Sequence, residues 1–229
     1  MQIIPALLEK SPTALFFQIK RLTPYFKIFQ IDIADGIFVP NKTVQIDDIM
    51  KHETYNMKHL TFDFHLMVND FEREIKKLEK LRNLLNIKNI FIHFSLSPNY
   101  SLLTTNYPLF SFCLVLNPED KVEDLAKHYT LNPIPCIQIM SVNPGFQGSP
   151  FIPQTLKKIE QLRLKDYRNK IYLDGAINQD TIPSILSIKN KPDSLCVGSF
   201  LSKAKNLNER VDYLREIKDW VILDFAGKS

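Results

Sequence analysis

Residues 28–41 read IFQIDIADGIFVPN, an apolar run that has the two-residue alternation of a β-strand and ends in a turn. Alternation places Gln30 and Asp32 on one face of this strand, and Ile31 and Ile33 on the other. A carboxylate on a strand otherwise rich in Ile and Phe is costly to desolvate unless a cation, a hydrogen-bond donor or a substrate compensates it. We therefore identify Asp32 as a candidate site residue.

Similar short apolar runs recur along the chain at the spacing of a βα unit. Amphipathic segments lie between them and carry helix-start signals such as Ser11-Pro12, a capping hydroxyl followed by proline at the first helical position. Eight alternations of strand and helix predict an α/β fold in which a parallel sheet closes into a (β/α)8 TIM barrel. The predicted strands are residues 2–8, 28–33, 61–67, 89–94, 112–116, 136–140, 170–173 and 194–197, and further helix starts are expected at 69–70, 118–120 and 178–180.

An open, doubly wound sheet is the alternative architecture for such a pattern. Its dinucleotide-binding fingerprint, GxGxxG after the first strand, is missing, and the whole chain holds only six glycines. No linker or low-complexity stretch interrupts the pattern, so we expect residues 1–229 to form a single barrel domain. The last helix is expected at about 207–220, and a short apolar C-terminal tail follows it after about residue 220.

Composition narrows the range of partners. The 229 residues are 45% hydrophobic and 24% charged, as in soluble globular proteins. The formal charge of +4 comes from 29 Lys and Arg against 25 Asp and Glu, without a dense basic tail, so we expect no nucleic-acid partner. The most basic run, residues 157–170, alternates charged and apolar residues and is interpreted as the solvated face of a helix. No run approaches the roughly 20 apolar residues that a membrane span needs, so no membrane partner is expected either.

The cysteines and the amino end indicate where the protein is located. Cys113, Cys136 and Cys196 each lie in an apolar strand-like run, without a CxxC motif or a His-spaced partner. We predict that all three are buried free thiols in a reducing cytosol. The first ten residues, MQIIPALLEK, have no basic segment before their apolar run and no small-residue cleavage pattern, so they do not indicate a secretory signal. A cytoplasmic location is therefore expected.

A barrel carries its working residues at the carboxyl ends of its strands. Two carboxylates from distant strands, Asp32 and Asp174, can face each other across such a mouth, where one removes a carbon-bound proton and the other delivers one to the opposite face. The enediolate formed in this way needs a cation or fixed dipoles beside its oxygens, and His65 with the two carboxylates can hold a divalent ion. The other polar or small residues at predicted strand ends are Gln30, Asp63, His93, Asn117, Met140, Ser141, Gly198 and Ser199.

Each of these residues also has a simpler interpretation. His65 is equally well explained as a hydrogen-bonded core histidine, and either aspartate as the cap of a loop. Only their joint placement at strand ends favours a site, and the chemistry that it favours is epimerisation.

Glycine turns in the second half of the chain predict an anion site. Residues 140–151 read MSVNPGFQGSPF and place Gly145 and Gly148 in a turn after a strand, while Gly175 and Gly198 follow the last two predicted strands. Glycine lets backbone N–H groups approach an anion, and phosphate near strands seven and eight recurs in barrels. Ordinary turns also use glycine, which is the alternative explanation.

The chain resembles the ribulose-phosphate 3-epimerase family, whose members act on ketose phosphates. DGIFVPN, HLMV and SVNPGF are together specific for it, and the matching segments follow the family's order from the first strand to the eighth. The full set is IIPALL, IDIADGIFVPN, FDFHLMV, FIHFSLS, LVLNPED, MSVNPGFQGSPFIPQTLKKI, YLDGAIN and VGSF.

The resemblance implies reversible inversion at C3 of D-ribulose 5-phosphate to D-xylulose 5-phosphate in the pentose phosphate pathway, by a homodimer or larger homo-oligomer. It implies Asp32 and Asp174 as the catalytic acid/base pair, and Asp32, His65, Asp174 and a further residue at position 30 as ligands of one divalent ion. The residues expected to bind substrate or phosphate are His65, Met67, Met140, Gly145, Phe146, Gln147, Gly148, Gly175, Ala176, Gly198 and Ser199.

Several positions depart from the family pattern. Gln30 replaces a metal-binding histidine, Ala34 a methionine and Ala6 an active-site serine, and DGA stands for DGG at Ala176. An amide oxygen is neutral and harder than imidazole, so whether the ion is Zn, Mn, Fe, Co or Mg stays open, with a shift towards Mn or Mg expected. The phosphate loop reads GFQGS where the family has GFGGQ.

Three candidate functions follow from the residues that are retained and from those that are replaced. The first is a metal-assisted pentulose 5-phosphate 3-epimerase. The second is the same chemistry on a longer ketose phosphate such as allulose 6-phosphate, because Ala34 and Ala6 are expected to leave room in the pocket. The third is a sugar-phosphate-binding homologue with impaired catalysis.

Overall fold

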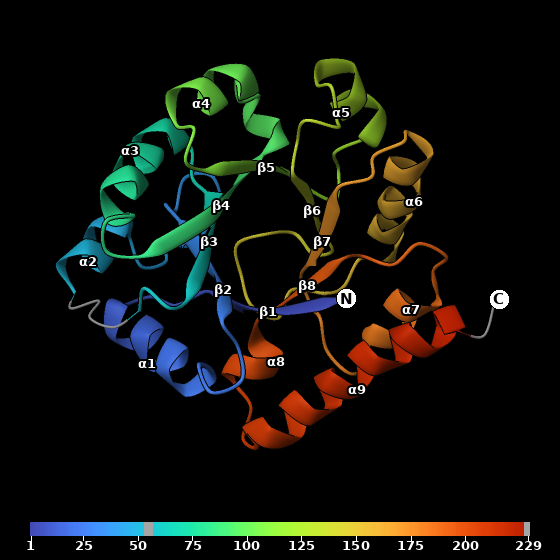
Figure 1. Ribbon diagram of the computed structural model, residues 1–229. Coiled ribbons are helices and arrows are strands. Elements are labelled where there is room, and N and C mark those ends of the chain that lie inside the picture. Colours follow the sequence, from blue (N-terminus) through green and yellow to red (C-terminus); the bar gives the residue numbers. More distant parts are fainter. Residues whose placement is uncertain (53–56, 227–229) are drawn as a thin grey trace.

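The computed structural model describes residues 1–52 and 57–226, with side chains up to residue 217. Eight parallel strands close into a barrel in chain order, with β1 paired to β8, and helices surround the ring (Figure 1). The (β/α)8 TIM barrel is thereby confirmed, and the open-sheet alternative is wrong. The strands are β1 (Gln2–Leu7), β2 (Ile28–Ala34), β3 (Thr61–Met67), β4 (Asn86–His93), β5 (Ser111–Leu116), β6 (Cys136–Met140), β7 (Lys170–Asp174) and β8 (Ser194–Val197).

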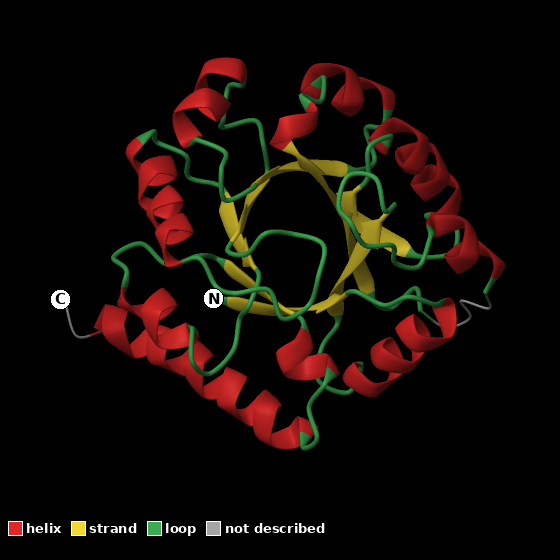
Figure 2. Ribbon diagram, turned by 180° about the vertical axis from the view of Figure 1, so that it is seen from behind, coloured by secondary structure: helices red, strands yellow, loops and turns green. Residues whose placement is uncertain are grey.

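Helices form the outer layer of the barrel, which Figure 2 shows from the opposite side. Ser11 caps the first helix through a bond from the backbone N–H of Ala14, and Asp70 caps the third through Arg73, as the sequence predicts. The helices are α1 (Pro12–Leu22), α2 (Ile46–Lys51), α3 (Phe71–Leu81), α4 (Tyr100–Asn106), α5 (Val122–His128), α6 (Lys157–Leu164), α7 (Ile182–Ser187), α8 (Ser199–Ser202) and α9 (Leu207–Ala226), with 3-10 turns η1 (Phe94–Leu96) and η2 (Pro153–Leu156).

Some helix boundaries differ from expectation. The helices expected after 118–120 and 178–180 are present as α5 and α7, and each begins two residues beyond its start signal, because Asp120 and Asn178 accept backbone N–H groups in the preceding turns. The basic run 157–170 is helical only over α6, and its end opens β7. The tail expected after about residue 220 is helical as far as Ala226, and residues 227–229 lie outside the described residues.

The core has two layers, because alternate strand residues point into and out of the barrel. The larger layer, between strands and helices, includes Ile31, Ile33 and Leu173. The smaller one fills the barrel interior and includes Phe91, Val115 and Tyr172. Polar side chains that share the inward face therefore meet inside the ring. Within the described residues, no helix is long and apolar enough to cross a membrane.

The cysteine prediction is wrong for two of the three residues. Cys113 and Cys136 form a disulfide between β5 and β6, and only Cys196 is a buried free thiol. The register pairs Leu114 with Ile137, which brings the preceding positions to a Cα–Cα distance of 5.1 Å. The bond depends on strand register, and the sequence spacing of the two cysteines carries no sign of it.

Candidate functional site

A cavity of about 320 Å³ opens at the carboxyl ends of the strands. The loop after β6 lies across this end of the ring in both ribbon views (Figures 1 and 2). All the residues predicted to bind metal, substrate or phosphate line this cavity except Gln30, and Ala6 lines it as well. They are Asp32, His65, Met67, Met140, Gly145, Phe146, Gln147, Gly148, Asp174, Gly175, Ala176, Gly198 and Ser199.

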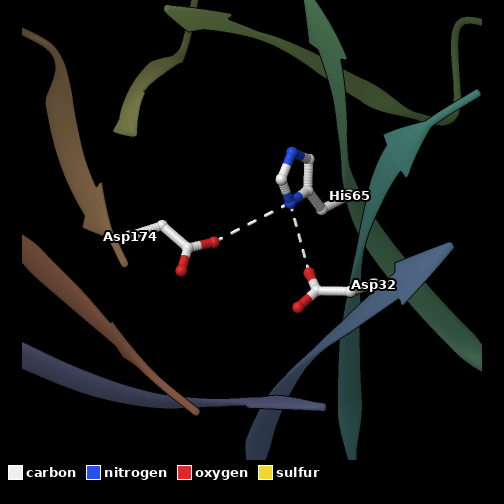
Figure 3. A group of neighbouring side chains, drawn as sticks. All are labelled: Asp32, His65 and Asp174. Carbon is white, nitrogen blue, oxygen red and sulfur yellow. Dashed lines mark hydrogen bonds and ion pairs between the residues drawn. The ribbon is translucent and has the colours of Figure 1, made fainter. Parts of the chain in front are cut away.

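Asp32 of β2, His65 of β3 and Asp174 of β7 meet at the cavity floor (Figure 3). His65 Nδ1 lies 3.2 Å from Asp32 Oδ1 and 3.7 Å from Asp174 Oδ2. The register places Asp32 directly beside His65, whereas Asp174 arrives from a distant strand. One ligand atom from each of the three residues lies within 4.8 Å of the other two, a separation that one ion or one small molecule can bridge.

Gln30 lies beneath this group and is fully buried. Its Nε2 donates to Asp32 Oδ1 at 2.9 Å and to Asp174 Oδ2 at 2.7 Å. Its Oε1 accepts from the thiol of Cys196 at 3.2 Å. In this orientation the amide is a donor that bridges the two carboxylates, and it would have to turn over to offer its oxygen to an ion.

A chain of buried hydrogen bonds fixes the ring of His65. His65 Nε2 lies 2.9 Å from His93 Nε2, and His93 Nδ1 lies 2.9 Å from Asn117 Oδ1. Burial and the neighbouring His65 hold the pKa of His93 well below its usual range, so His93 is neutral and donates through Nδ1 to Asn117. His93 Nε2 is then an acceptor, which makes His65 Nε2 the donor.

The hydrogen bonds that join His65, His93 and Asn117 also bear on whether a metal ion suits the site. With a hydrogen on Nε2, the His65 ring faces the oxygens of Asp32 and Asp174 with Nδ1, the atom that would bind a metal ion. One imidazole nitrogen and two carboxylates are a donor set for a divalent cation, and the amides of Gln30 and Gln138 now donate to the same carboxylates. These three residues therefore fit an ion, and Gln30 fits it only after its amide turns over.

The electrostatics of the floor favour proton exchange by Asp174. Burial, and after it the charge of Asp32, raise the pKa of Asp174 to about 7, against the opposing effects of His65 and Gln30. A carboxyl group with such a pKa can both hold and release a proton near neutral pH.

Two glycines shape the other wall of the cavity. Gly175 has φ +120°, and a Cβ at this position would lie 2.6 Å from Val142 Cγ2. Gly145 has φ +113°, and its Cβ would lie 2.9 Å from Val39 Cβ. Both positions thus need a left-handed backbone and close packing, which only glycine allows at low cost.

One hydrogen bond joins two loops at the mouth. Asn41 Nδ2, in the loop after β2, donates to the carbonyl of Gly145, in the loop after β6. Phe146, the next residue, is 51% exposed at the rim of the cavity. The loop after β6, which lines the cavity, is therefore tied to the loop after β2.

Some residues at predicted strand ends lie elsewhere, and others were missed. Asp63 does not line the cavity, and His93 and Asn117 lie behind His65. Ala34 is fully buried and does not line the cavity either, so it adds no room for substrate. The sequence analysis missed Gln138, although alternation in CIQIM places it on the same inward face as Met140.

Comparisons with known proteins agree with this geometry. The model of the ribulose-phosphate 3-epimerase family matches residues 2–201. Ribulose-phosphate 3-epimerase of Methanocaldococcus jannaschii is 30% identical over 207 residues, which cover 88% of this chain and 84% of that protein. The cytoplasmic isoform of ribulose-phosphate 3-epimerase from Oryza sativa is 27% identical, with 81% and 80% covered. The solved structure of 3-keto-L-gulonate-6-phosphate decarboxylase from Vibrio cholerae superposes with a TM-score of 0.63 at 13% identity over 95% of this chain and 97% of that one, which supports the fold alone.

Proposed function

The chain belongs to the ribulose-phosphate 3-epimerase family, and we propose that it converts D-ribulose 5-phosphate to D-xylulose 5-phosphate by inverting C3. As a member of this family it is an isomerase, an epimerase that acts on phosphorylated carbohydrates. The observation that supports the specific reaction best is the convergence of Asp32 and Asp174 from opposite parts of the ring on one cavity. We place the reaction in the pentose phosphate pathway.

Proton transfer is assigned to the two carboxylates. One of them takes the proton from C3, and the electron pair of that bond enters the enediolate. The other delivers a proton to the opposite face of the same carbon, which inverts it. The raised pKa of Asp174, about 7, suits a group that exchanges protons in both directions near neutrality.

Asp32, His65 and Asp174 would hold the divalent ion, as their donor atoms lie within 4.8 Å of one another. When bound, such an ion supplies electrostatic stabilisation to the enediolate oxygens. Its identity among Zn, Mn, Fe, Co and Mg stays a prediction. The phosphate group is assigned to the wall formed by Gly145, Gly148 and the backbone at Gly175, with Gly198 and Ser199 at its base.

A hexulose 6-phosphate such as allulose 6-phosphate is the second candidate substrate. Only Ala6 supports it, because Ala6 lines the cavity and Ala34 does not. Rate constants measured on both sugars decide between them. A homologue that only binds sugar phosphate is the third candidate. Binding alone does not require two opposed carboxylates at one cavity floor, so this candidate is less well supported.

The test is a coupled assay of purified protein on ribulose 5-phosphate, with and without added Mn, Zn, Fe, Co or Mg. We expect xylulose 5-phosphate to form, and activity to disappear in Asp32→Asn and Asp174→Asn. Asp63→Asn is the matched control, a buried aspartate on the same strand as His65 that does not line the cavity. Absence of product with every metal, together with absence of deuterium exchange at C3, would refute the proposal.

The remaining partners stay predictions. We expect a homodimer or larger homo-oligomer, which light scattering on the purified protein checks, and no nucleic-acid partner. A cytoplasmic location is proposed from the family, one of whose plant members is named a cytoplasmic isoform.

A further inference from the structure

Gln138 of β6 is a fully buried amide at the back of the site that no role has yet explained. Its Nε2 donates to Asp174 Oδ2 at 3.0 Å. The same nitrogen lies 3.5 Å from His65 Nδ1 and 3.5 Å from the sulfur of Met140. A buried amide with these contacts belongs to the polar network of the cavity floor, although it does not line the cavity itself.

The surroundings fix which way the Gln138 amide faces. The carboxylate of Asp174 and the thioether of Met140 are acceptors, so they require the nitrogen of the amide. The other side of the amide, Oε1, lies 3.9 Å from the sulfur of Cys196, whose one hydrogen is donated to Gln30 Oε1 at 3.2 Å. Turning the Gln138 amide over would set its oxygen against the Asp174 carboxylate and is therefore disfavoured.

The bonds made by Gln138 distinguish the two carboxylates. Asp174 Oδ2 accepts from Gln138 and also from Gln30, which leaves Oδ1 as the oxygen without an amide donor. Asp32 Oδ1 accepts from Gln30 and contacts His65, and within the described chain it has no bond to Gln138. Gln138 thus holds one member of the acid/base pair and leaves the other alone.

We propose that Gln138 is a positioning residue that anchors Asp174 through Oδ2, so that Oδ1 is presented to C3 of the substrate. This inference rests on the proposed epimerase function. Gln138 does not touch the reacting atoms and acts only through Asp174.

This positioning role predicts different effects on the two C3 epimers when Gln138 is replaced. Each epimer loses its C3 proton to one carboxylate and, after inversion, regains one from the other. If Asp174 is misplaced and Asp32 is not, the epimer that Asp32 deprotonates still forms the enediolate. It then takes up solvent deuterium and returns to its starting configuration. The epimer that depends on Asp174 for deprotonation loses exchange and conversion together.

The test compares Gln138→Met and Gln138→Leu with the wild-type protein, since both replacements remove the amide donor and put an apolar side chain in its place. Starting from ribulose 5-phosphate and from xylulose 5-phosphate in D2O at saturating metal, NMR measures deuterium at C3 of the recovered substrate and the conversion to product. We expect kcat to fall about 10- to 100-fold with KM changed less than about twofold, as for partners that orient a site residue. The ratio of exchange to conversion should rise by a similar factor for one epimer only.

Asn89→Leu is the matched control, because Asn89 is a buried residue that hydrogen-bonds a buried carboxylate, Asp63, outside the cavity. It should lower the melting temperature and keep the wild-type ratio for both epimers. Circular dichroism verifies that each variant is folded, and the second Gln138 variant carries the test if the first does not fold. Equal loss of exchange for both epimers, or wild-type kinetics, overturns the positioning role. If the wild-type protein itself neither exchanges nor converts, the proposed function has failed instead.

Discussion

Two buried aspartates inside the same barrel, Asp63 and Asp174, behave differently. Burial raises the pKa of both, to about 6 and about 7 respectively. Asp63 is bonded by Asn89, its Oδ2 has no hydrogen-bond partner among the described residues, and it does not line the cavity. Asp174 has two amide donors, a second carboxylate and an imidazole around it, on a cavity floor. A raised pKa alone thus reports burial, and the convergence of several groups on a cavity indicates a site.

Activity provides the largest expected contrast between the two aspartates. Asp174→Asn removes one proton carrier and should lower kcat by about 10²- to 10⁴-fold, the usual contribution of a positioned acid/base group. Asp63→Asn should retain kcat within about twofold. Steady-state assays of both variants check this, and a comparable loss in Asp63→Asn would remove the distinction.

Stability should show the effect of burying the Asp63 carboxyl group. The folded-state pKa of Asp63, about 6, lies above its ordinary 3.8, so the folded protein binds the proton more tightly. This tighter proton binding stabilises the folded state fully below pH 3.8, and the stabilisation is lost as the pH rises towards 6. An asparagine cannot ionise, so Asp63→Asn avoids this loss. The variant should therefore be more stable than the wild type by about 3 kcal/mol at pH 7, and by little at pH 3. Urea unfolding across pH 3–8 measures it, and a constant difference would contradict the assignment.

Metal binding should separate the same two regions. At an ion concentration 100 times Kd, a bound ion raises the unfolding free energy by about 2.7 kcal/mol. We expect Mn or Zn to raise the melting temperature of the wild type and of Asp63→Asn, and not that of His65→Leu. Calorimetry with and without chelator checks this. An equal rise in His65→Leu would place the ion elsewhere.

Ala176 offers the smallest effect. It follows the cavity-wall Gly175 and has φ 52°, in the left-handed region. That conformation costs a non-glycine residue about 1 kcal/mol or more, offset in part by the greater freedom of glycine in the unfolded chain. Ala176→Gly should therefore change stability by less than about 1 kcal/mol and keep activity, as thermal melts and the coupled assay test. A larger destabilisation would show that the methyl group packs against the site.

Local patterns were enough to predict the barrel and the proximity of three polar residues at its mouth. Apolar runs marked all eight strands because a parallel strand is buried on both faces. The rule that barrel sites lie at strand ends brought Asp32, His65 and Asp174 together correctly. The rule ignores depth along the strand, and this is why Asp63 was placed in the same ring.

Contacts between distant strands account for what the sequence analysis missed. The Cys113–Cys136 bond depends on the register of β5 against β6, and the orientation of Gln30 depends on Cys196 from β8. Neither follows from the spacing of residues. Gln138 is a different case from the disulfide and Gln30. Its polar side chain stands out within the apolar run CIQIM, but its partner, Asp174, is known only from the pairing of β6 with β7.

The bond between Asn41 and the Gly145 carbonyl has a consequence for turnover. It connects the loops that follow β2 and β6, so the cavity-lining turn at Gly145 can move away from the loop after β2 only after this bond breaks. Breaking one neutral hydrogen bond costs about 0.5–1.5 kcal/mol, which thermal motion supplies readily. Any step of the cycle that moves the turn at Gly145 away from the loop after β2 carries that cost in addition to its own.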